Sequence, residues 1–428
     1  MDNEEITLAR PDEPRTKFWR ISRDGARLVR ASWAGDGKAR ESVREIGGSA
    51  ADVRQAYQRE VRKKMRDGFV FVRDVREARV GELVLECLEP NGHDSRAFDL
   101  RPDGALIAVG SVLKDAHGAE IHLIDVATGA RRLVHTEPYG PAGSRQTFLH
   151  QVLFDAGGSG LVYAVNGQTR HLDLRTGTTR VLADYQDHVT SRFNPFCVKP
   201  LWDGRRERLL VFDANDMVRV LDAHGRPVWE VSTASPTTEC RAAAISASGR
   251  RVALYRPSRG IVYGHQDAEH DTTNEIEVWD IDDAQRVGVV RVPAPLSRRG
   301  LSAIGFDGPE THVLTSPDPV QGPCALSADG LVAWHFPDER RTDRWDTCFS
   351  WAYSPDGSLL AIGRRGSRGL DLRDATSREP VPFPLERVED HRVHRIAYSA
   401  DGTLIAAGGD SGVITVRKLR GGLPADAA

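Results

Sequence analysis

The chain of 428 residues has little cysteine and no long apolar segment. Its five cysteines are far apart and odd in number, which argues for reduced thiols and against a disulfide framework or a zinc site. They are Cys87, Cys197, Cys240, Cys324 and Cys348. No apolar run approaches the ~20 residues of a membrane helix, and the start, Met1 to Glu5, is too polar for a secretory signal. These absences predict a cytoplasmic protein without a membrane contact.

Motifs for catalysis and cofactor binding are missing as well. The sequence has no Gly-x-Ser-x-Gly elbow, no phosphate-binding Gly-x-x-x-x-Gly-Lys loop, no His-Glu-x-x-His pair and no nicotinamide-binding fingerprint. The stretch 35–38 has a glycine-lysine pair but lacks the upstream glycine and the following Ser or Thr. We therefore expect no enzyme activity, no catalytic residues and no cofactor.

One polar stretch is the remaining candidate for metal chemistry. Residues 264–271 include His265, His270 and three acidic residues. Such side chains can hold a divalent ion only if they converge, which a loop rarely achieves without ligands from elsewhere. We interpret the stretch as a solvated loop between strands that binds no metal, with a metal or catalytic site as the alternative.

A short phrase recurs along the chain and predicts its architecture. Asp-Gly stands before an apolar run at 101–109, 354–362 and 399–407, with weaker copies at 247–250 and 326–330. Asp-Gly supplies the positive φ of a tight hairpin turn, so each copy predicts strand, turn, strand. The 40 glycines and 23 prolines also fit a turn-rich β protein.

The phrase belongs to a long repeat. Seven units begin near residues 95, 147, 192, 240, 300, 347 and 392. Their spacing is typical of propeller blades, roughly 40–45 residues plus loop insertions. Several units close with an apolar strand that ends at Asp, as in Ile124-Asp125 and Trp279-Asp280. These units resemble WD40 repeats over about 330 residues.

That resemblance implies a mainly β fold, with a seven-bladed WD40-like propeller over residues 76–428. Six or eight blades remain alternatives. In WD40 proteins a buried His–Asp contact staples a blade, so Asp187-His188 and Asp390-His391 are interpreted as structural, with a functional role as the alternative. The last unit ends at 414–418 and is one strand short. We predict that a strand at 82–87 pairs with 413–418 and closes the ring, because closure removes an exposed edge.

The N-terminal residues differ from the repeat in charge and in periodicity. The formal net charge is −3, yet residues 15–73 carry 16 basic and 7 acidic side chains. This balance favours a polyanionic partner, with a solvated basic surface as the alternative. Short strands are predicted at 17–21, 26–30 and 40–45. Ser49 followed by Asp52 predicts a helix start, Gly68 predicts its end, and apolar residues share one helical face. They are Val53, Ala56, Tyr57, Val61 and Met65.

This order of elements resembles a WGR domain, a module of DNA-dependent poly(ADP-ribose) polymerases and of many bacterial proteins. The matching segments are 17–21, Trp33, 49–57 and 64–69. At the name-giving motif the chain has Trp33-Ala34-Gly35-Asp36-Gly37, so the tryptophan matches while the glycine and arginine do not. The resemblance implies a small α+β domain over residues 1–75. In the polymerases that arginine helps to grip DNA, and here other basic residues would replace part of its charge.

The candidate nucleic-acid-binding residues are therefore Trp33, Lys38, Arg40, Lys63 and Lys64. An exposed Trp33 would stack on a base, and the alternative is a core residue of a small domain.

Together these patterns predict a non-enzymatic recognition or adaptor protein. In this interpretation the N-terminal domain contacts nucleic acid and a propeller face binds a protein partner. The alternative is a protein-interaction scaffold in a bacterial multi-component system that has lost DNA binding. The abundance of Arg over Lys, with much Ala, Gly and Asp, indicates a GC-rich bacterial genome. The sequence predicts neither the partner nor the oligomeric state.

Overall fold

The fold is known from a computed structural model, which describes most of the chain. The described residues are 4–11, 15–89, 97–113, 118–138, 149–184, 200–213, 217–235, 240, 242–256, 275–292, 304–315, 324–328, 331–335, 348–364, 369–383, 393–409 and 412–420.

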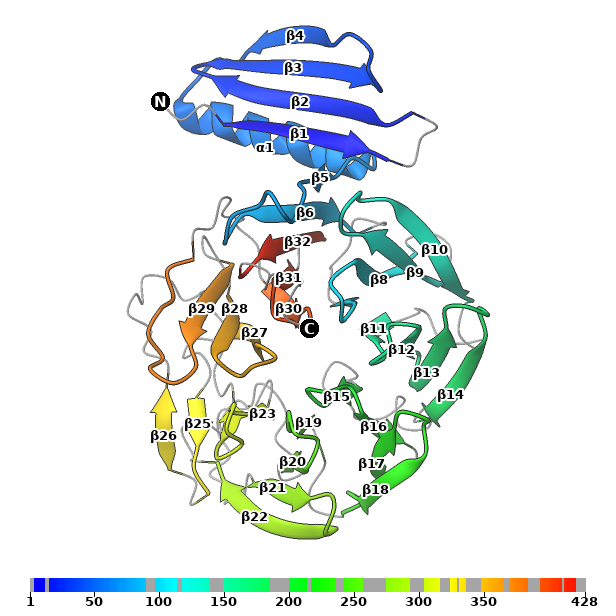
Figure 1. The fold of residues 1–428 in the computed structure, drawn as a ribbon. Coiled ribbons are helices and arrows are strands. Elements are labelled where there is room, and N and C mark those ends of the chain that lie inside the picture. The colour runs from blue at the N-terminus through cyan, green and yellow to red at the C-terminus, as the bar shows by residue number, and fades with distance from the viewer. Residues whose placement is uncertain are drawn as a thin grey trace, which may run out of the picture.

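The first four strands form an antiparallel sheet that is covered on one face by a helix (Figure 1). The strands are β1 (Glu5–Arg10), β2 (Lys17–Asp24), β3 (Arg27–Ala34) and β4 (Arg40–Glu45), hydrogen-bonded in this order. The sequence predicted β2, β3 and β4 but missed β1. Leu8, Trp19, Ile21 and Leu28 from the sheet are buried together with the apolar face of the helix.

The helix α1 (Ala50–Arg66) is the α-helix of the described residues, and its start matches the prediction. The Ser49 hydroxyl accepts from the backbone N–H of Asp52 at 3.3 Å, and the Asp52 carboxylate accepts from the backbone N–H of Ser49 at 2.6 Å. This reciprocal capping box satisfies N–H groups that a helix start leaves without partners. All five predicted apolar residues are buried. No helix among the described residues is long and apolar enough to cross a membrane.

Seven further sheets follow in the described part of the chain. The first three contain β7 (Phe98–Leu100), β8 (Leu106–Val112), β9 (Ala119–Asp125) and β10 (Arg131–Glu137); β11 (Leu149–Phe154), β12 (Gly160–Val165), β13 (Gln168–Asp173) and β14 (Thr179–Asp184); and β15 (Leu201–Trp202), β16 (Arg208–Asp213), β17 (Met217–Asp222) and β18 (Pro227–Ser232).

The next three contain β19 (Ala242–Ile245), β20 (Arg251–Arg256), β21 (Glu275–Asp280) and β22 (Gln285–Arg291); β23 (Ile304–Phe306), β24 (Val313–Thr315), β25 (Cys324–Leu326) and β26 (Val332–His335); and β27 (Cys348–Tyr353), β28 (Leu359–Arg364) and β29 (Leu370–Asp374). Figure 1 shows the sheets around a ring, with labelled first strands such as β11, β15 and β19 near the centre and last strands such as β14, β18 and β22 at the rim. The prediction of a mainly β chain is confirmed, while the number of blades stays a prediction.

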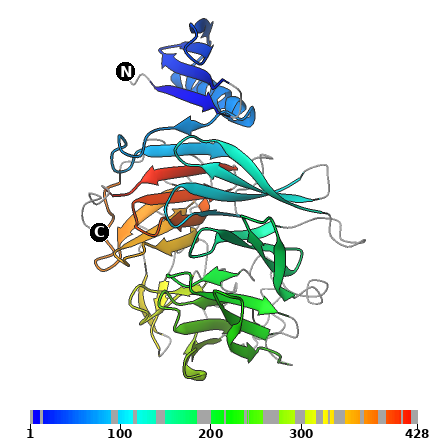
Figure 2. The ribbon, with the colours of Figure 1, turned by 45° about the vertical axis from the view of Figure 1, so that its right-hand side comes forward.

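The last sheet joins the two ends of the repeat region. It contains β30 (Val393–Tyr398), β31 (Leu404–Gly409), β32 (Val413–Lys418), β6 (Leu83–Leu88) and β5 (Phe71–Val72), in this order. The strand expected at 82–87 is thus β6, and it pairs antiparallel with β32, with Leu85 opposite Val416. Every residue of β6 is buried. Figure 2 shows the N-terminal sheet and its helix at the rim of the ring, beside this last sheet.

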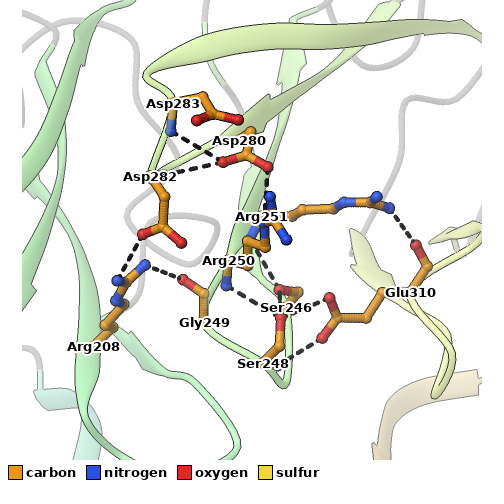
Figure 3. A network of polar contacts seen from close by, with 10 residues as sticks. All are labelled: Arg208, Ser246, Ser248, Gly249, Arg250, Arg251, Asp280, Asp282, Asp283 and Glu310. Atoms are coloured by element: carbon orange, nitrogen blue, oxygen red, sulfur yellow. Dashed lines mark hydrogen bonds and ion pairs between the residues drawn. The ribbon is translucent and has the colours of Figure 1, made fainter.

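The inner hairpin turns of neighbouring sheets are tied together by arginines and backbone bonds (Figure 3). Arg208, the first residue of β16, donates to the carbonyl of Gly249 at 2.9 Å, and Arg251, the first residue of β20, donates to the carbonyl of Glu310 at 2.6 Å. The Glu310 carboxylate accepts from the N–H and the hydroxyl of Ser248 at 2.6 and 2.8 Å. Arginines at equivalent places of two sheets therefore each reach the turn of the next sheet.

Gly249→Ala is predicted to destabilise the protein through these turns. Gly249 has φ +74°, and a Cβ there would lie 2.5 Å from Oδ2 of Asp203. Asp203 is buried and accepts from the backbone N–H of Glu207 at 2.7 Å, so it has little freedom to move. We expect a loss of about 2–4 kcal/mol in the free energy of unfolding, measured by urea denaturation.

Gly357→Ala is the matched control for this prediction. Gly357 has nearly the same φ, +71°, but no atom lies within 4 Å of its hypothetical Cβ. The control should lose only the conformational part, about 1–2 kcal/mol. Equal losses in the two variants would show that the contact with Asp203 contributes nothing.

A buried carboxylate links the rim of the first sheet to the second. Glu137 on β10 is 4% exposed and lies 2.8 Å from Nε2 of His135. It also accepts from the Tyr163 hydroxyl on β12 and, at 3.0 Å, from Arg170 on β13. Burial raises the pKa of Glu137, but the hydrogen bonds from His135 and Tyr163 and the Arg170 charge outweigh burial and hold this pKa below its ordinary value.

This lowered pKa predicts a pH dependence of stability. Because the folded pKa of Glu137 is below the unfolded one, its contribution is present above about pH 4.5 and is lost as the pH falls through the folded pKa. We expect Glu137→Gln to cost about 1–3 kcal/mol at pH 7 and less at pH 3, measured by denaturant unfolding at each pH. A cost that does not change with pH would contradict this assignment.

Candidate nucleic-acid interface

Trp33 lies on the face of the N-terminal sheet that the helix leaves open. Side chains alternate along a strand, and Trp19 and Ile21 of β2 pack on the helix side. Phe18 therefore points to the open face, and it is the cross-strand partner of Trp33. The two rings are stacked, with centroids 5.3 Å apart and an angle of 17° between their planes. Trp33 is half-buried, so part of the residue remains accessible beside Phe18.

Lys38 and Arg40 lie where β3 turns into β4. The turn is held by a hydrogen bond from the Gly37 N–H to the Ala34 carbonyl at 3.0 Å. Arg40 is the first residue of β4 and lies opposite Ser32 of β3. Both basic side chains are exposed, and neither makes an ion pair with any described residue. They are therefore available to an anionic ligand.

The two candidate lysines of α1 have different surroundings. Lys64 lies 3.5 Å from the Asp67 carboxylate, and its Nζ is 5.3 Å from the centroid of the Phe69 ring. Lys63 is exposed and has no carboxylate partner within the described ranges. The structure thus favours Lys63 over Lys64 as a contact for a ligand.

Sequence reasoning missed most of the positive charge of this helix. We call the following residues the α1 cation face; all are exposed and unpaired with acidic groups in the described part of the chain: Arg54, Arg59, Arg62, Lys63 and Arg66. A helical projection finds all of them except Arg54, because they lie on the side of the helix away from the buried apolar face. Glu60 turns away from them to Arg30 and Arg44 of the sheet, at 3.6 and 3.4 Å. The Asp52 carboxylate, at the start of the helix, is engaged by the backbone N–H and the hydroxyl of Ser49.

The structure brings only some of the predicted site residues together. In Figure 1 α1 finishes at the end of the sheet where β1 and β3 finish and β4 begins. Lys38, Arg40 and the C-terminal part of the α1 cation face therefore belong to the same end of the N-terminal unit. Trp33 points to the opposite side of the sheet from the helix. A ligand that touches both must wrap around this end.

The arginines of the open face are largely neutralised by neighbours. Arg20 lies 3.3 Å from Glu41, and Arg27 lies 3.1 Å from Glu45. Both pairs are exposed, so they contribute little to stability. They do cancel charge, so the open face combines paired charges with the Phe18–Trp33 stack. The net positive potential comes from the helix side and the end of the sheet.

Other sequence candidates contribute no site among the described residues. Cys87, Cys240 and Cys324 are free, buried thiols, and burial raises the pKa of Cys87 to about 12. In the ranges that are described, no group of three or more metal-ligating side chains gathers. The stretch 264–271, the pairs Asp187-His188 and Asp390-His391, and Cys197 lie outside the described residues.

Comparisons with known proteins agree with the ring of sheets. The family model "WD domain, G-beta repeat" matches residues 383–416, so the chain contains a WD40 repeat there. A chain of the structure titled "Crystal Structure of Mitotic Checkpoint Complex" is similar in fold, with a TM-score of 0.53 and 14% sequence identity. The similarity covers 80% of this chain and 95% of that chain. A search of curated proteins gives no match.

Proposed function

We propose that the protein is a non-enzymatic adaptor with two recognition units. Residues 1–75 act as a WGR-like α+β domain that contacts nucleic acid, and residues 76–428 act as a seven-bladed propeller that binds a protein partner. The WD40 repeat at 383–416 and the fold likeness support the propeller and its use as a binding scaffold. The seven sheets support the blade number.

The α1 cation face carries the nucleic-acid part of the proposal. A helix of 17 residues is roughly 25 Å long, which spans several phosphates of a duplex backbone. Because these cations have no carboxylate partner, a phosphate can bind them without breaking an ion pair. Binding then releases counterions from the DNA, and this release favours the complex through entropy. Contacts of this kind position a protein on the backbone without reading bases. We therefore propose binding with little sequence preference.

Trp33 adds a preference for ends or nicks in this proposal. Only an unstacked terminal base presents a free face to the Trp33–Phe18 stack. The arginine missing from the name-giving motif would weaken this end recognition. Lys38 and Arg40 lie where β3, the strand that contains Trp33, turns into β4, and they supply part of the lost positive charge.

The open sheet face favours a second candidate function, a scaffold that binds only proteins. Val43 is 60% exposed on β4 and lies opposite Val29, on the same face of the sheet as the Phe18–Trp33 stack. Exposed apolar residues on an uncovered face are typical of protein contacts. If wild-type protein fails to bind duplex DNA in low salt, this second function replaces the first.

Replacing Trp33 by Ala is predicted to remove the preference for ends. Affinity for a nicked or blunt duplex should fall about tenfold, the effect of one lost stacking contact, while affinity for a closed circular duplex should stay the same. Fluorescence anisotropy with labelled duplexes and circular competitor measures both. Trp33→Phe keeps an aromatic ring and is the control, which should retain most of the preference. Equal behaviour of wild type and Trp33→Ala would exclude stacking.

A further inference from the structure

A cluster of charged side chains lies where the first strands of the first, second and last sheets meet. Its acidic member is Asp99 on β7, which is only 2% exposed. Asp99 Oδ2 accepts from the backbone N–H of Phe154 on β11 at 2.9 Å. It also accepts from Nη1 of Arg206 at 2.6 Å. Asp99 is thus fully engaged by one guanidinium and one amide.

Arg206 reaches this position from the turn between β15 and β16. Its backbone has φ +58°, a conformation that a residue with a side chain rarely adopts. Its guanidinium donates to the carbonyls of Phe154 at 2.9 Å and Leu100 at 3.3 Å, besides the bond to Asp99. The side chain is 19% exposed. Asp99 and Arg206 therefore form a complete ion pair between sheets.

Arg395 on β30 is a second guanidinium in the same cluster, and it has only neutral acceptors. Its Nε donates to the carbonyl of Phe98 at 3.3 Å. With its amide oxygen turned toward Arg395, the buried Gln151 accepts from Nη1 at 2.9 Å and from Nη2 at 3.3 Å. No carboxylate of the described residues pairs with Arg395.

The cluster therefore holds two guanidinium groups against one carboxylate. Burial lowers the pKa of Arg395, and the Arg206 charge lowers it further against the opposing effect of Asp99. Arginine nevertheless stays protonated, so the surplus positive charge remains. A half-buried charge without a counter-charge is costly, and the cost is removed when an anion binds. The Arg395 guanidinium also keeps N–H groups that its neutral partners do not use.

We propose that Arg395, beside the Asp99–Arg206 pair, forms an oxyanion site on the inner strands of the ring. The site takes a carboxylate or phosphate group, which a guanidinium binds through paired N–H donors. A free anion and an acidic side chain of a protein partner share this chemistry. The site is separate from the α1 cation face, so its test is independent of the proposed contact with nucleic acid.

The test is thermal unfolding of the full chain with inorganic phosphate, compared with NaCl at equal ionic strength. At ten times its Kd, phosphate should raise Tm by about 2–4 °C beyond the NaCl reference. Arg395→Met should lose this phosphate-specific rise and should show an unchanged or higher Tm in NaCl alone, because the uncompensated charge is gone. Arg373→Met is the matched control. Arg373 is buried as well, but it lies 3.1 Å from Asp371, so the phosphate-specific rise should persist.

Asp99→Asn supplies a test in the opposite direction. It leaves two guanidinium groups without a carboxylate, so its Tm should fall in NaCl and rise more with phosphate than that of wild type.

Isothermal titration with a short glutamate-rich peptide distinguishes the two possible sources of the anion. Peptide binding that is tighter than phosphate binding and is lost in Arg395→Met indicates a carboxylate of a protein partner. Phosphate binding alone indicates a free anion. The proposal is overturned if wild type and Arg395→Met respond equally to phosphate, or if neither responds.

Discussion

Leu85→Asp should unfold the propeller. Leu85 is fully buried in β6, opposite Val416 of β32, within the core between the last and first sheets. The substitution removes a core side chain and buries a carboxylate without a partner, and together these cost more than about 5 kcal/mol. Domains have a total stability of about 5–15 kcal/mol, so most of it is lost. Circular dichroism and Tm of the purified variant measure the result.

Val80→Asp is the control for this prediction. Val80 lies just before β6 and is 43% exposed, so its replacement should change stability by less than about 0.5 kcal/mol. Strand β6 pairs with β32 and so joins the two ends of the ring. If Leu85→Asp kept the far-UV spectrum and Tm of wild type, the ring would close without β6, and the proposed role of this strand would be wrong.

Neutralising the α1 cation face should have the largest effect on DNA binding. The triple variant Arg62→Gln, Lys63→Gln, Arg66→Gln keeps good helix formers at exposed positions, so the fold should be unchanged. Each lost phosphate contact lowers the slope of log K against log salt by about one. We expect affinity for duplex DNA to fall about 100-fold in low salt, measured by fluorescence anisotropy.

An equal change of charge on the propeller is the control. Arg132, Arg175 and Arg205 are exposed, and none makes an ion pair with the residues that are described. Their triple Gln variant has the same net charge as the α1 variant and should bind DNA within about twofold of wild type. Equal losses in both variants would indicate a response to net charge alone.

Local chemistry made the helix and the hairpins predictable. Ser49 and Asp52 form a capping box from residues three positions apart, and the apolar face of α1 follows from a single period. The Asp-Gly phrases at 103–104, 356–357 and 401–402 become turns with positive φ at the glycine. Strand β6 was predictable for a different reason, since the last unit lacked a strand.

Relations between distant elements were not predictable. The short strand β5 follows α1 in the chain, but the sequence does not predict that β5 pairs with β6 of the last sheet. Trp33 and Lys63 were both predicted as contacts for nucleic acid. In the structure Trp33 lies on the open face of the sheet, whereas Lys63 lies on the helix that covers the other face. Asp99, Arg206 and Arg395 come from three different sheets, and no periodicity in the chain predicts that they lie close together.

The salt dependence of DNA binding by the full chain shows whether the α1 cation face contacts phosphates. Log K for a blunt duplex should fall linearly with log salt, with a slope of about −3 to −5, as expected if most of these cations contact phosphates. The slope of the α1 triple variant should be smaller by about 2–3. Undetectable binding at ~50 mM salt, or affinity that stays constant up to ~500 mM, would contradict a phosphate contact.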